Sequence, residues 1–98
     1  SIPEVRPGTK HSFHAYVIRA KRRDKLKDFL LGKGIQTVVH YPCALPYEPA
    51  YKELHHSPAD FPVAHRLAQE VLSLPIYPEI TKEQIEYVCD TVRDFYEK

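Results

Sequence analysis

Hydrophobic and polar residues alternate over residues 12–20, SFHAYVIRA, near the start of the chain. Phe13, Ala15 and Val17 fall on one side of this alternation, and the segment is rich in aromatic and β-branched residues. A period of two with this composition is typical of a strand. The opposite positions are not uniformly polar, so we expect both faces of the strand to be at least partly covered.

The spacing of apolar residues then changes to that of a helix. Leu26, Phe29 and Leu30 are three or four positions apart, and two glycines follow them in LLGKG. This pattern predicts a short amphipathic helix over residues 24–33, which glycine in a left-handed conformation can end. The β-branched residues of 35–39, IQTVV, predict a second strand directly after it.

The middle of the chain, residues 40–62, has no clear period and is interrupted by prolines. One helical turn is expected at EPAYKEL, residues 48–54, because Pro49 suits the first position of a helix. After this region Val63 and Leu67 begin an apolar stripe with helical spacing. The segment VLSLP that follows predicts a short extended exit ended by Pro75.

The last segment carries a helix start signal and a long apolar stripe. Thr81 and Gln84 have the spacing of a capping box, in which each side chain bonds the backbone N–H of the other. The stripe expected to face the core consists of Ile85, Val88, Cys89, Val92 and Phe95. Together the elements predict an α+β fold of the α/β sandwich kind, a small sheet of two to three strands with helices packed on it.

Composition is that of an ordinary globular domain. The 98 residues include 14 Lys and Arg against 13 Asp and Glu, so the charge balance does not indicate a nucleic-acid partner. No apolar run approaches the ~18 residues of a membrane span, so we expect no membrane association. Cys43 and Cys89 form no CxxC pair and are expected to be reduced thiols. These observations favour the cytoplasm.

Three kinds of chemistry receive little support from the pattern. Six histidines suggest a metal site, but their spacing places no cysteine or carboxylate beside them as a further ligand. The basic run of residues 19–27 reads better as a solvated helix start that Asp24 and Asp28 neutralise than as a phosphate site. Cys43 lies three positions after His40 in a proline-rich loop, which does not establish a nucleophile and its base.

The stretch TVVHYPCALPYEP holds the strongest candidate site residues. A strand that ends on His40 and Tyr41 presents two polar side chains at a sheet edge, where loops often carry function. Pro42, Pro46 and Pro49 reduce the conformational freedom of the loop that holds them. Equally, Tyr41 could cap the core and His40 could be a buried, hydrogen-bonded imidazole. The pattern alone does not separate these two interpretations.

Several segments together resemble one protein family. HSFHAYVIR, KGIQTVVHYPCALPYEPAY and DFPVAHRLAQEVLSLPIYPEITKEQIEYV are similar, in order and spacing, to the C-terminal small domain of the DegT/DnrJ/EryC1/StrS family. These are sugar aminotransferases that use pyridoxal phosphate (PLP) and act on nucleotide-linked keto-sugars. The resemblance implies that residues 1–10 are a linker from a missing upstream large domain and that residues 11–98 are the small domain.

The resemblance also implies a division of labour in the parent enzyme. The large domain would supply the cofactor lysine and most of the PLP pocket, and a homodimer partner would complete the active site. His40 and Tyr41 would contact the nucleotide-sugar substrate, whereas no catalytic residue and no PLP are expected in this chain alone. The alternative is a stand-alone α/β interaction or regulatory module that kept the fold without catalysis.

Overall fold

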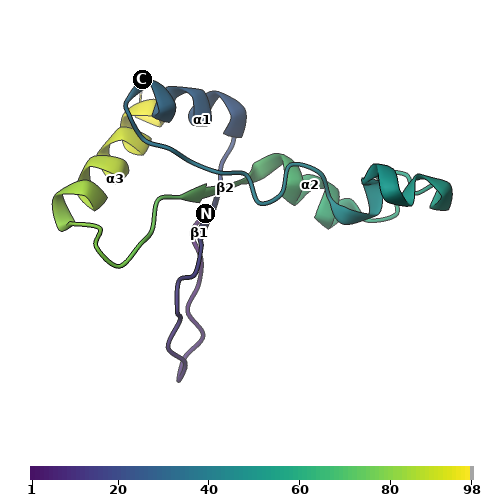
Figure 1. The fold of residues 1–98 in the computed structure, drawn as a ribbon, viewed down its shortest axis with the longest axis horizontal. Coiled ribbons are helices and arrows are strands. Elements are labelled where there is room, and N and C mark those ends of the chain that lie inside the picture. The colour runs from purple at the N-terminus through teal and green to yellow at the C-terminus, as the bar shows by residue number, and fades with distance from the viewer. Residues whose placement is uncertain (98) are drawn as a thin grey trace.

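The computed structural model describes residues 1–97, which are organised around a two-stranded antiparallel sheet (Figure 1). The elements in chain order are β1 (Tyr16–Arg19), α1 (Arg23–Gly32), the 3-10 helices η1 (Leu45–Tyr47) and η2 (Pro49–Leu54), α2 (Pro62–Glu70), β2 (Val71–Leu74) and α3 (Lys82–Glu97). A small sheet with helices packed on it is the predicted fold class, which is therefore confirmed.

The sheet is smaller than the sequence pattern predicts. β1 and β2 pair from Tyr16 opposite Leu74 to Arg19 opposite Val71, so the predicted strand over residues 12–20 is too long. β2 has four residues and is followed by Pro75, which has no backbone N–H to donate. Residues 12–15 consequently have no strand to pair with.

The predicted strand over residues 35–39 is wrong as a full strand. Only one antiparallel bridge forms there, between Val38 and Ser73. The two backbones exchange hydrogen bonds of 3.2 Å, from the N–H of Val38, and 2.7 Å, from the N–H of Ser73. This bridge still fixes the segment that follows α1 against the free edge of β2.

The core lies between the sheet and α1. Leu26 and Leu30 of α1 and Leu72 of β2 are fully buried, and Ile18 and Ile35 are nearly so. α1 spans residues within one position of the predicted helix at each end. The helical spacing of the leucines therefore identified the buried face of α1 correctly.

The final helix begins as its sequence predicts. The backbone N–H of Thr81 donates to Gln84 Oε1 at 2.9 Å, and the N–H of Gln84 donates to Thr81 Oγ1 at 3.2 Å. The predicted apolar stripe is only partly covered, because Val88, Val92 and Phe95 pack on the core whereas Ile85 and Cys89 are exposed. The expectation that the whole stripe faces the core is thus corrected.

Two tyrosines tie α3 to the ends of α1. The hydroxyl of Tyr87 donates to the carbonyl of Lys33 at 2.7 Å, and the hydroxyl of Tyr96 donates to the carbonyl of Lys21 at the same distance. Burial raises the pKa of the Tyr96 phenol, and the charge of Arg22 opposes part of that rise. Both phenols must remain protonated to make these bonds.

One arginine of the basic run is buried, contrary to the prediction of a solvated helix start. Arg23 is 7% exposed, and its guanidinium donates to the carbonyl oxygens of Ala68 and Val71 at 3.0 and 2.8 Å. It also bonds Asp24 at 2.7 Å. The side chain therefore satisfies carbonyls at the junction of α2 and β2, a need that the local sequence pattern does not reveal.

The molecule is elongated. Its radius of gyration is 15.7 Å, against about 13 Å for a compact chain of this length. Figure 1 shows η1, η2 and part of α2 extending to one side as an arm, and the N-terminal segment looping away below the sheet. The segment returns because Ser1 and Arg19 exchange backbone hydrogen bonds of 2.8 and 2.9 Å.

Candidate functional site

A groove of about 650 Å³ lies between the segment that follows α1, the exit from β2 and the first turns of α3. His40 and Ser73 lie on its wall together with His14, which enters from the residues before β1. No Asp, Glu, Lys or Arg is among its lining residues. The groove can therefore offer apolar contacts and neutral hydrogen bonds, but it has no fixed charge of its own.

His40 reaches the groove because the bridge at Val38 fixes the backbone two residues earlier. Its Nδ1 lies 2.9 Å from the hydroxyl oxygen of Ser73. The imidazole is nevertheless exposed, so one ring nitrogen is held by the protein while the other edge of the ring remains accessible.

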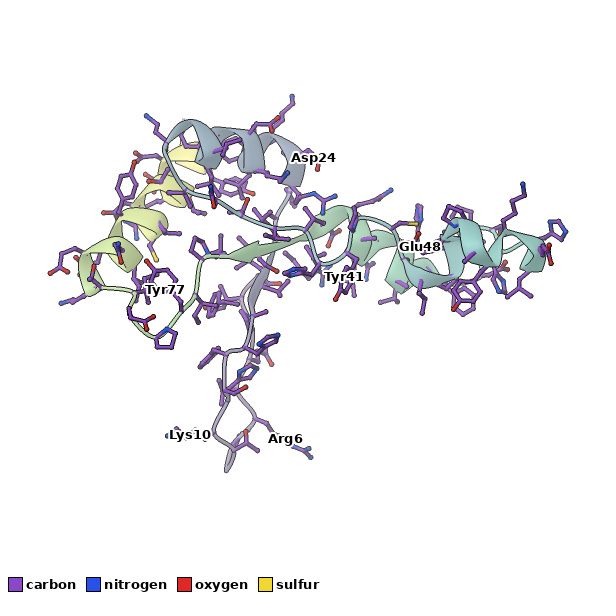
Figure 2. The ribbon with its side chains drawn as sticks, in the orientation of Figure 1. Arg6, Lys10, Asp24, Tyr41, Glu48 and Tyr77 are labelled. Carbon is purple, nitrogen blue, oxygen red and sulfur yellow. The ribbon has the colours of Figure 1, made fainter. Side chains whose placement is uncertain are left out.

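Tyr41 directly follows His40 but does not line the groove. The residue is 72% exposed, and its ring makes an edge contact with the His40 ring at 5.4 Å between centroids. Figure 2 places Tyr41 where the arm leaves the sheet. Tyr41 therefore does not cap the core, and His40 is hydrogen-bonded as that interpretation holds but is exposed and not buried.

The sequence pattern missed several polar groups of the groove. The hydroxyl of Tyr77 donates to Gln84 Oε1 at 3.1 Å, so the capping glutamine also holds a tyrosine on the groove wall. Tyr87 lines the same wall, although its hydroxyl already donates to the carbonyl of Lys33, directly after α1. Tyr77 lies in a loop, and Tyr87 lies on a helix for which the sequence pattern indicated only the capping box and the apolar stripe.

Ser73 was also missed, although the sequence holds a signal for it. It is the only polar residue of β2, VLSL, where it lies between the buried Leu72 and the half-buried Leu74, and a buried polar side chain needs a hydrogen-bond partner. The structure supplies His40 as that partner.

The lysines among residues 1–97 lie outside this groove. A cofactor lysine needs a desolvated pocket, yet no lysine lines the groove. Every lysine among residues 1–97 is exposed apart from the half-buried Lys27. Within the same residues no group of three or more His, Cys, Asp or Glu side chains is placed to hold a metal ion.

A second groove, of about 290 Å³, is strongly apolar. It lies between the loop before β1, the exit of β2 and the outer face of α3. Ile85 and Cys89, the uncovered part of the α3 stripe, line it together with Phe13 and Ile76.

Both cysteines of the chain are free. None of the helices over residues 1–97 is both long and apolar enough to cross a bilayer.

Comparison with known proteins finds matches over nearly the whole chain. The model of the DegT/DnrJ/EryC1/StrS aminotransferase family matches residues 1–93. A pleiotropic regulatory protein of Geobacillus stearothermophilus is 42% identical over 94 residues, covering 96% of this chain and 25% of the relative. The dTDP-3-amino-3,4,6-trideoxy-alpha-D-glucose transaminase of Streptomyces venezuelae is 36% identical over 97 residues, covering 99% of this chain and 26% of the relative.

A solved structure gives the same result in three dimensions. The chain superimposes on S. venezuelae DesV, crystallised in complex with a ketimine intermediate, with a TM-score of 0.92 and 36% sequence identity. The match covers 99% of this chain and 26% of the DesV chain. The chain therefore spans about a quarter of the length of the relatives it matches.

Proposed function

Since the chain belongs to the DegT/DnrJ/EryC1/StrS aminotransferase family, we propose that it is the C-terminal small domain of a PLP-dependent enzyme that transfers an amino group to a nucleotide-linked keto-sugar. Residues 1–10 are the linker from the large domain, and residues 11–98 are the small domain. The observation that carries the proposal is the superposition over 99% of this chain on a structure that holds a ketimine intermediate.

In this proposal the groove supplies substrate contacts and the missing large domain supplies the chemistry. His40 and Tyr41 are exposed neighbours that can each donate or accept a hydrogen bond, and they contact the nucleotide-sugar. The groove has no cation, so the charge of a diphosphate is balanced by residues of the large domain or of a homodimer partner. PLP and its lysine likewise belong to the large domain.

The apolar groove beside α3 supports the existence of that large domain. Ile85 is 46% exposed and Ile76 is 36% exposed. The chain covers only about a quarter of the length of its relatives. Uncovered apolar side chains that line one groove are typical of an interaction surface. We assign this surface to the large domain of the same polypeptide.

The free thiols of both cysteines are consistent with the reducing environment of the cytoplasm.

The experiment compares the full-length protein with the 98-residue chain. Each is incubated with PLP, L-glutamate and a dTDP-linked keto-sugar, and the amino-sugar product is measured by mass spectrometry. We expect product from the full-length protein only, because no lysine lines the groove of this chain. After desalting, the full-length protein should also retain PLP absorbance, and the isolated chain should not.

Two results would contradict the proposal. A full-length protein that retains no PLP would not be an enzyme of this kind, and the stand-alone interaction or regulatory module would then be favoured. An isolated chain that retains stoichiometric PLP would show that the division between the domains is wrong.

A further inference from the structure

Ser73 contacts the segment that carries the candidate site with both its backbone and its side chain. It is 6% exposed and lies at the middle of the described sheet, opposite Val17 of β1 and bridged to Val38 on its other side. Its backbone fixes Val38, and its side chain reaches His40, two residues further along the same segment. One residue of β2 therefore sets both the path of the segment and the orientation of the imidazole.

The hydrogen bond between Ser73 and His40 has a preferred direction. Among residues 1–97 the Ser73 hydroxyl has no other hydrogen-bond partner. If His40 Nδ1 carried the proton and donated it, the serine proton would be left without an acceptor, and an unmade bond at a buried donor is costly. If the hydroxyl donates to Nδ1, its proton is satisfied. The neutral imidazole then carries its own proton on Nε2.

Nε2 has no hydrogen-bond partner among residues 1–97, and His40 is exposed on the groove. We infer that Ser73 is a positioning residue that holds neutral His40 with its proton on Nε2, so that the site presents a hydrogen-bond donor to an oxygen atom of the substrate. The role of this donor in substrate binding rests on the proposed function. The tautomer itself does not.

The tautomer is measured first, in the 98-residue chain. Two-bond ¹H–¹⁵N correlation spectra at about pH 9, where an ordinary histidine is neutral, report which ring nitrogen is protonated. We expect His40 to carry its proton on Nε2 in the wild type. In Ser73→Ala the ratio should shift about threefold to tenfold toward Nδ1, the equivalent of one ordinary hydrogen bond.

Two further variants separate positioning from general destabilisation. Ser73→Thr keeps the hydroxyl in a strand that tolerates threonine, and it should retain the wild-type tautomer. Thr91→Val removes another buried hydroxyl, which donates to the carbonyl of Tyr87 at 2.6 Å in α3. It should leave the His40 signals unchanged. A wild-type His40 protonated mainly on Nδ1, or an unchanged tautomer in Ser73→Ala, would overturn the inference.

The second measurement uses calorimetric titration of the full-length enzyme with dTDP, UDP and their glucose conjugates. Ser73→Ala should lower the affinity for each nucleotide that binds the wild type by about threefold to tenfold, whereas Thr91→Val should leave these affinities unchanged. If the affinity falls for the free nucleotides as well as for their glucose conjugates, the acceptor oxygen belongs to the nucleotide. If it falls for the glucose conjugates alone, the acceptor oxygen belongs to the sugar. If wild-type binding is seen and Ser73→Ala changes neither, the donor role is wrong. If no nucleotide binds the wild type, the proposed function fails while the tautomer result stands.

Discussion

Replacing His40 by alanine in the full-length enzyme is expected to lower kcat/KM by about tenfold to a hundredfold, the worth of one or two hydrogen bonds to a charged ligand. The exposed imidazole contributes little packing. The free energy of unfolding should therefore fall by only about 1 kcal/mol, most of it from the loss of the bond to Ser73. Steady-state kinetics and thermal unfolding of the same preparations measure both effects.

A matched variant makes this prediction specific. His65 is a half-buried histidine of α2 that contacts Tyr47 and Gln69 and does not line the groove. His65→Ala should leave kcat/KM within about twofold of the wild type. If His40→Ala lowered the unfolding midpoint strongly and spared kcat/KM, its role would be structural and the site assignment would be wrong.

Replacing Leu30 by alanine should destabilise the domain more than any change at the groove. Leu30 is fully buried between α1 and the sheet. Truncation removes its apolar contacts and leaves a cavity, so we expect the free energy of unfolding to fall by about 3 kcal/mol. This is a large share of the 5 to 15 kcal/mol that stabilises a typical domain, by a rough estimate. Urea unfolding followed by circular dichroism gives the value.

The adjacent residue is the control. Leu31 has the same side chain in the same helix but is 61% exposed, so Leu31→Ala should cost less than about 0.5 kcal/mol. Equal costs at the two positions would mean that α1 does not pack on the sheet by the face described above.

Elements whose stability is local were predictable from the sequence. The leucine spacing of α1 and the capping box at Thr81 each act within a few residues, and both appear as predicted. The short extended segment ended by Pro75 was predicted and is β2, but the extent of β1 and of the segment 35–39 was not predictable. A strand needs a partner, and β2 offers only four residues before Pro75. The segment 35–39 therefore makes a single bridge in spite of its β-branched composition.

The candidate site was half predictable for the same reason. His40 and Tyr41 stood out because two polar side chains follow an apolar run and precede a proline-rich loop. Ser73 is 33 positions from His40, so no local pattern links the two residues. The burial of Arg23 depends in the same way on carbonyls of the distant α2 and β2.

The most direct test of the central claim is a crystal structure of the full-length enzyme with a bound, unreactive nucleotide-sugar. The measurement is the distance from His40 Nε2 and from the Tyr41 hydroxyl to the nearest ligand oxygen. We expect at least the His40 distance to lie at about 2.7 to 3.2 Å, within hydrogen-bond range. A ligand bound with all its oxygens beyond hydrogen-bond range of His40 Nε2 would contradict this expectation.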